Sequence, residues 1–115
     1  MRVVIVDDSE DLRRLLSLVL TEAGHQVVGE APDGAQGVEE VERRHPDAVV
    51  LDYDMPVMSG LEALPRMLSA CPATRVVLFT SGMSGAVQEA ARGLGAAAVL
   101  EKTAGVDALL EALTP

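Results

Sequence analysis

Four aspartates follow two hydrophobic runs of the chain, at the points where those runs end. Asp7 and Asp8 come directly after the run VVIV, and Asp52 and Asp54 come after the run VVL. An apolar run that ends abruptly in acids is typical of a buried parallel strand whose carboxyl end reaches solvent. In open α/β sheets that edge is where ligands bind, so these acids are candidate binding residues.

Several of these acids would converge on one small volume if the two strands are neighbours in the sheet, which would bring Asp7, Asp8 and Asp52 together. Like charges held that close repel strongly unless a cation lies between them. Oxygen ligands, including one or two carboxylates, are what Mg²⁺ prefers in proteins. The sequence therefore indicates a divalent metal site and a chemistry that uses the metal.

Two further predicted strands end in groups that would complete such a site. The fourth ends in Thr80, Ser81 and Gly82, which offer two hydroxyls and a sterically open backbone. The fifth ends in Glu101 and Lys102, and the lysine offers an ammonium. Acids that hold a metal, one acid that attacks, and a hydroxyl and an ammonium that bind oxygens suit phosphoryl transfer.

Five short apolar runs alternate with five helical patterns along the chain. The expected strands are Arg2–Asp7, Gln26–Ala31, Asp47–Asp52, Arg75–Thr80 and Ala97–Glu101. The expected helices are Glu10–Ala23, Ala35–Arg44, Gly60–Ala70, Ala86–Leu94 and Val106–Leu113. Because strict strand–helix alternation with short connections is typical of a parallel sheet covered on both faces, the pattern predicts an α/β fold. Pro65 falls inside the third helical pattern, so we expect an irregular first turn or a late start there.

The composition limits the classes of function. A chain of 115 residues without a linker or repeat predicts a single domain over residues 1–115. The formal net charge of −9 disfavours direct binding to nucleic acid or to an anionic membrane. Cys71 is the only cysteine, and we find neither a secretory signal nor an apolar stretch of membrane-spanning length. We therefore expect a cytoplasmic protein.

The acids, hydroxyl and lysine, in this order and each at a strand end, resemble the receiver domain of two-component response regulators. The resemblance covers nearly the whole chain. The residues that carry it are the pair Asp7-Asp8, the stretch Leu51–Pro56 with Gly60 four residues on, Thr80, and Lys102. It implies a doubly wound, flavodoxin-like sheet of five parallel strands in the order 2-1-3-4-5, with five helices on both faces.

The resemblance also implies how the acids divide their work. Asp52 would accept a phosphoryl group from a sensor histidine kinase, a phosphotransfer protein or a small phosphodonor. Asp8 and Asp52, with the backbone carbonyl of Asp54, would ligate Mg²⁺, and Asp7 would contribute through water. The chain would act as a signalling switch that catalyses only its own phosphorylation and slow dephosphorylation, rather than as a metabolic enzyme.

The resemblance also assigns roles to Thr80 and Lys102. The chain departs from the family pattern at three positions: Val99, Thr103 and Asp54, which places an extra negative charge beside the acceptor. Thr80 would bond a phosphoryl oxygen and shift on phosphorylation, and Lys102 would pair with another oxygen. Val99 stands where the family often has an aromatic residue whose rotation reports the phosphorylated state, so an aromatic switch is not expected. Thr103 stands where the family often has proline, so a cis bond is not expected there. By resemblance, the fourth helix, fifth strand and fifth helix would form the partner face, as in a homodimer.

Other interpretations of the same residues stay open from the sequence. A Mg²⁺-dependent phosphohydrolase of the haloacid-dehalogenase kind also uses an Asp-x-Asp pair, which Asp52 and Asp54 match loosely. A pseudo-receiver would be an interaction module without phosphotransfer. The chain could also be the N-terminal part of a longer regulator. Residue by residue, an isolated acid such as Asp8 could be a helix N-cap, and Lys102 a surface lysine.

Overall fold

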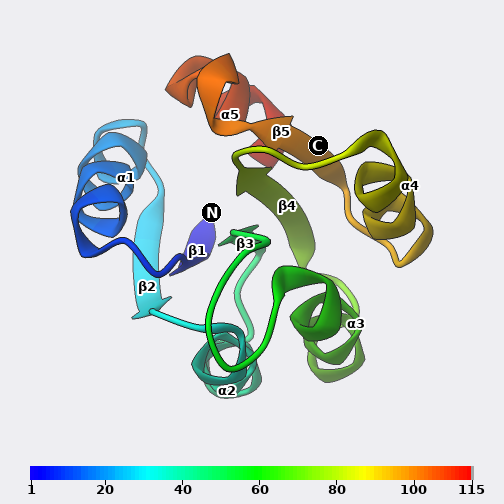
Figure 1. Cartoon of the computed structure of the whole chain (residues 1–115). Coiled ribbons are helices and arrows are strands. Elements are labelled where there is room, and N and C mark those ends of the chain that lie inside the picture. The colour runs from blue at the N-terminus through cyan, green and yellow to red at the C-terminus, as the bar shows by residue number, and fades with distance from the viewer. Residues whose placement is uncertain (115) are drawn as a thin grey trace.

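The computed structural model describes residues 1–114 as five parallel strands alternating with five α-helices (Figure 1). The strands are β1 (Arg2–Val6), β2 (Gln26–Ala31), β3 (Ala48–Leu51), β4 (Arg75–Thr80) and β5 (Ala98–Glu101). The helices are α1 (Glu10–Glu22), α2 (Gly34–Arg44), α3 (Gly60–Ala70), α4 (Gly85–Gly93) and α5 (Val106–Leu113), with a short 3₁₀ turn at Lys102–Ala104. The predicted α/β class and element order are confirmed, and no bound differs from the expected one by more than one residue.

The strands pair in the order β2-β1-β3-β4-β5, and every pairing is parallel. Strand β1 therefore lies between β2 and β3, and its last residue, Val6, is in register with Ala31 on one side and Leu51 on the other. Parallel strands present their carboxyl ends at one edge of the sheet. The order thus brings the residues after β1 and after β3 to adjacent points on that edge, as predicted.

Two apolar layers hold the helices against the sheet. Alternate strand residues point to opposite faces, so Val3 and Ile5 pack with residues of α1 and α5, while Val4 and Val6 pack with residues of α2, α3 and α4. Figure 1 shows α1 and α5 on one face and the other three helices on the opposite face. All four of these strand side chains are fully buried, and burying one such side chain contributes about 1.5–3 kcal/mol.

The helix over Gly60–Ala70 corrects the expectation drawn from Pro65. Helix α3 begins at Gly60 with a complete capping box between Ser59 and Glu62, and it continues through Pro65 to Ala70. Proline removes one helical N–H donor, but the capping box satisfies the first turn and the helix buries one face against the sheet. The packing and the cap therefore outweigh the lost bond, and the helix starts neither late nor irregularly.

Within residues 1–114, no helix combines the length and the apolar character that a membrane crossing needs.

The loop between β3 and α3 is held close to the end of β3 by backbone contacts. The N–H of Gly60 donates to the carbonyl of Tyr53 at 2.8 Å, so the start of α3 folds back on the residue after Asp52. A Cβ atom at Gly60 would collide with the backbone carbonyl oxygen of Asp52. Val57, at the tip of the loop, has a φ of 69°, and the Met58 N–H donates to the Pro56 carbonyl across it. This is a tight and strained turn for a β-branched residue.

We predict that Gly60→Ala destabilises the protein by about 1–3 kcal/mol, because the new methyl group has to displace the Asp52 backbone. Urea unfolding measures the change. Gly93→Ala is the matched control: nothing lies within 4 Å of its Cβ position, so this change at the end of α4 should be neutral or stabilising by up to about 1 kcal/mol. Equal stability of the two variants would contradict the proposed crowding at Asp52.

Candidate functional site

Three carboxylates meet at the carboxyl edge of the sheet. Asp7 and Asp8 directly follow β1, Asp52 directly follows β3, and one oxygen atom from each lies within 4.8 Å of the others. Asp7 and Asp52 are 2% and 6% exposed, whereas Asp8 is exposed to solvent. The cluster is thus a half-buried acidic pocket with one carboxylate on its open side.

Lys102 supplies the positive charge at this pocket. It follows the edge strand β5 directly, and its Nζ lies 2.9 Å from Asp7 Oδ2 and 3.3 Å from Asp52 Oδ2. The side chain is 26% exposed, so water screens these ion pairs less than it would a surface pair. The structure thus brings Lys102 together with Asp7 and Asp52 at one edge of the sheet.

Asp52 Oδ1 accepts two further hydrogen bonds. The hydroxyl of Thr80, at the end of β4, donates to it at 2.6 Å, and the backbone N–H of Tyr53 donates at 2.8 Å. The same N–H lies 3.4 Å from the Thr80 hydroxyl oxygen. One carboxylate oxygen of Asp52 therefore faces neutral donors, and the other faces the lysine ammonium.

The environment raises the pKa of both Asp7 and Lys102. The shift disfavours the charged form of the Asp7 carboxyl and favours the charged form of the Lys102 ammonium. Burial raises the pKa of the Asp7 carboxyl and the nearby Asp52 charge adds to this, while the Ser9 N–H and Lys102 offset only part. Burial alone would lower the pKa of the Lys102 ammonium, but its contacts with Asp7 and Asp52 outweigh burial and raise it. Lys102 therefore stays charged at neutral pH, whereas the ionised form of Asp7 lowers the stability of the folded protein.

The donor set fits a hard divalent cation such as Mg²⁺. The cluster of Asp7, Asp8 and Asp52 offers only carboxylate oxygens, and its open side admits the waters that Mg²⁺ retains. Burial is the main cause of the raised Asp7 pKa, and a bound cation would relieve the smaller contribution that comes from the Asp52 charge. The carboxylate of Asp54 is exposed and is not one of the three clustered acids.

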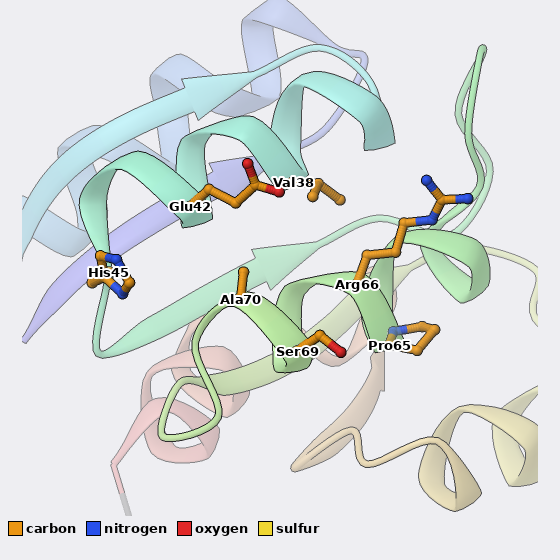
Figure 2. A pocket seen from close by; sticks show the side chains of 7 residues that line it. All are labelled: Val38, Glu42, His45, Pro65, Arg66, Ser69 and Ala70. Carbon is orange, nitrogen blue, oxygen red and sulfur yellow. The ribbon is translucent and has the colours of Figure 1, made fainter.

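A surface groove lies elsewhere on the molecule. It has a volume of about 710 Å³ and runs between α2 and α3 (Figure 2). Its lining residues are Val38, Glu42, His45, Pro65, Arg66, Ser69 and Ala70. None of them is a clustered acid, and the groove contains no second arrangement of hydroxyl, lysine and carboxylate. This groove therefore lacks the set of groups that the sequence analysis connected with phosphoryl transfer.

Two contacts at the pocket were not predicted from the sequence. The backbone N–H of Tyr53 is one, because a main-chain donor leaves no trace in residue type. The other is Arg13 on α1, whose Nη1 donates to the backbone carbonyl of Asp7 at 2.6 Å. The available signal was its position: a charged residue between Leu12 and Leu16, at the edge of the apolar stripe of α1.

Comparisons with known proteins agree with this geometry. The family model described as "Response regulator receiver domain" matches residues 3–114. The chemotaxis protein CheY of Listeria monocytogenes is 33% identical over 98% of this chain and 95% of its own length. The response regulator domain of Thermotoga maritima CheB superposes with a TM-score of 0.88 at 30% identity, covering 98% of this chain and 92% of that domain.

A longer relative matches over only part of its length. "Protein-glutamate methylesterase/protein-glutamine glutaminase 3" of Hahella chejuensis is 40% identical over 86% of this chain, but the match spans 28% of that protein. The chain thus spans about a quarter of the length of the methylesterase relatives that it matches.

We predict that Asp7→Asn stabilises the metal-free protein at pH 7, by on the order of 1 kcal/mol, the size typical of relieving strain at a functional site. Because the folded-state pKa of Asp7 is raised above its ordinary value of 3.8, the wild-type carboxyl favours folding below that value and loses this contribution as pH rises through the folded pKa.

Thermal unfolding in EDTA, at pH 7 and near pH 4, measures the difference between wild type and Asp7→Asn. The difference should shrink at the lower pH, where Asp7 takes up a proton. Asp11→Asn on the exposed face of α1 is the matched control and should change stability little. A less stable Asp7→Asn at pH 7 would show that Lys102 more than compensates for burial.

Proposed function

The chain belongs to the response regulator receiver domain family, and we propose that it is a phosphorylation-dependent signalling switch with Asp52 as the phosphoryl acceptor. The domain is of the kind found in CheY and CheB. The observation that carries the proposal is the convergence of Thr80 and Lys102 on the two oxygens of the Asp52 carboxylate, inside a cluster of acids. This arrangement provides a nucleophile with donors beside it for the oxygens of a transferred group.

In the proposed forward step, a carboxylate oxygen of Asp52 attacks the phosphorus atom of a phosphohistidine on a sensor kinase or phosphotransfer protein. A P–O bond forms, the P–N bond breaks, and the imidazole leaves with the bonding electron pair. A small phosphodonor would react in the same way with its own leaving group. Thr80 and Lys102 would each bind an oxygen of the transferred group, and the charge of Lys102 would offset part of its negative charge.

A divalent cation fits the proposal. Asp8 and Asp52, with the carbonyl of Asp54, would hold Mg²⁺, and Asp7 would act through water. Bound there, Mg²⁺ would neutralise charge on the acids and on the phosphoryl oxygens. Asp8 is the exposed member of the cluster, so it can adjust to the cation without breaking a buried contact.

The return step makes the switch reversible. Water attacks the phosphorus of the Asp52 acyl phosphate, the P–O bond to the carboxylate breaks, and inorganic phosphate leaves. The protein would thus catalyse only its own phosphorylation and slow dephosphorylation. The haloacid-dehalogenase alternative loses its support, because the family match identifies the fold and the Asp54 carboxylate lies outside the cluster.

The domain's setting is also part of the proposal. Residues 1–115 would form one receiver domain in the cytoplasm, where a buried free thiol such as that of Cys71 stays reduced. It would act alone, as a protein of CheY length does, or as one part of a longer regulator. Its partner would be a sensor histidine kinase or phosphotransfer protein. The face formed by α4, β5 and α5 would make the state-dependent contact, as in a homodimer.

We predict that wild-type protein gains one phosphoryl group from acetyl phosphate in the presence of Mg²⁺ and that Asp52→Ala gains none. The reason is that the substitution removes the attacking oxygen while the other acids remain. Intact-mass measurement after short incubation detects the added group, and EDTA should abolish it in wild type.

Three outcomes separate the interpretations. Labelling of Asp52→Ala at the wild-type level would exclude Asp52 as the acceptor. A wild-type protein that neither labels nor binds beryllofluoride with Mg²⁺ would instead be a pseudo-receiver. Steady turnover of a generic phosphatase substrate would support a phosphohydrolase.

We further predict that Asp54→Asn shortens the lifetime of the phosphorylated protein several-fold. The exposed Asp54 carboxylate lies two residues after the acceptor, and its negative charge opposes the approach of a water that gains hydroxide character as it gives up a proton. Decay of the phosphorylated form after removal of the phosphodonor measures the rate. Decay that is faster in wild type than in the variant would contradict this role.

A further inference from the structure

Arg13 makes a contact at the pocket that the proposed phosphotransfer chemistry does not use. From the second turn of α1 its guanidinium reaches back over the loop after β1, and Nη1 donates to the carbonyl oxygen of Asp7 at 2.6 Å. Its side chain is only 16% exposed. The next residue, Arg14, is 73% exposed and pairs with Glu10 on its own helix. The two arginines therefore differ in surroundings while sharing a charge and a helix.

The bond from Arg13 acts on a defined part of the backbone. The carbonyl of Asp7 belongs to the planar peptide unit that links Asp7 to Asp8. The N–H of Asp7 already donates to the Ala31 carbonyl at 3.0 Å, and its carboxylate accepts the Ser9 N–H at 2.9 Å. Arg13 supplies the remaining constraint, because it fixes the plane from which the Asp8 side chain departs.

A second carboxylate orients the guanidinium. Arg13 Nε lies 3.4 Å from Oε1 of Glu30, which is next to the end of the edge strand β2. Glu30 is 41% exposed, so the pair adds little energy. The pair nevertheless orients the planar guanidinium of Arg13, so that Nε faces Glu30 and Nη1 faces the Asp7 carbonyl.

We propose that Arg13 is a positioning residue for the metal site: it holds the Asp7–Asp8 peptide so that the Asp8 carboxylate is directed at the cation. The inference rests on the proposed function, because it assumes that the acid cluster binds Mg²⁺. Asp8 is the exposed acid of the cluster and depends on its backbone for its direction. Contacts that orient metal ligands typically change metal affinity by about 10–100-fold when they are removed.

Charge and positioning predict opposite effects for the loss of Arg13. If the guanidinium acts only as a positive charge near the acids, its removal makes the pocket more negative and strengthens Mg²⁺ binding. If it fixes the peptide, its removal frees Asp8 and weakens Mg²⁺ binding. The sign of the change in affinity therefore separates the two roles.

The test is a titration with MgCl₂ at pH 7, monitored by calorimetry and by backbone amide shifts. It uses five proteins: wild type, Arg13→Met, Arg13→Lys, Arg14→Met and Asp8→Asn. We expect Arg13→Met to weaken Mg²⁺ binding about tenfold. Arg13→Lys keeps the charge but lacks the planar fork, so it should weaken binding less. Arg14→Met removes the same charge from the exposed side and should bind as well as wild type, or slightly better.

The outcomes are distinguishable from failure of the proposed function. Arg13→Met binding as tightly as wild type, or more tightly, overturns the positioning role while leaving the metal site intact. Wild type that does not bind Mg²⁺, or an Asp8→Asn variant that binds it equally well, overturns the metal site and this inference with it. Thermal unfolding in EDTA checks the fold of each variant. If Arg13→Met does not fold, Arg13→Lys decides, because a charge-only role predicts wild-type affinity for it.

Discussion

The rest of the site depends on one interaction. The ammonium of Lys102 forms ion pairs with the buried carboxylates of Asp7 and Asp52. Two acids held this close and shielded from water would repel strongly, and one of them would take up a proton. Lys102 limits that tendency without removing it, since the pKa of Asp7 stays raised by its burial. The sheet order makes the contact possible: β1 and β3 are adjacent, and a long side chain after β5 spans the width of β4 to reach them.

The fold and the meeting of the acids could be predicted from the sequence, because the apolar pattern of each strand agrees with the burial that the whole sheet imposes on it. The β-branched runs around Val4, Val50 and Val77 are buried on both faces, as continuous apolar strands in a parallel sheet should be. Each run stops at a polar residue that cannot stay in the core, so the strand ends mark the functional edge. For this reason Asp52, Thr80 and Lys102 could be placed together before any geometry was known, although their individual signals are modest.

The features that the sequence did not reveal depend on packing between distant segments. Pro65 suggests a broken helix when its own hydrogen bond is considered alone, but the Ser59–Glu62 capping box and the buried face of α3 decide the outcome. Arg13 looks like one of two equivalent charges on α1, and only the path of the loop after β1 distinguishes it from Arg14. A tertiary contact to a backbone carbonyl has no signature in residue type or spacing.

If the proposed function is right, the same Lys102 contact requires that Mg²⁺ binds before Lys102 can contact a phosphoryl group. In the structure the ammonium is paired with Asp7 and Asp52, the two buried acids that a cation would approach. Mg²⁺ would take over the neutralisation of these acids, which leaves Lys102 free to turn toward an incoming phosphoryl oxygen. Thr80 already points at the acceptor, so its hydroxyl has only a short distance to move. Val99 is partly buried against the core and has no ring to rotate. On this proposal, displacement of Thr80, Lys102 and the loops that follow them would report the phosphorylated state, because these are the groups whose hydrogen-bond partners would change.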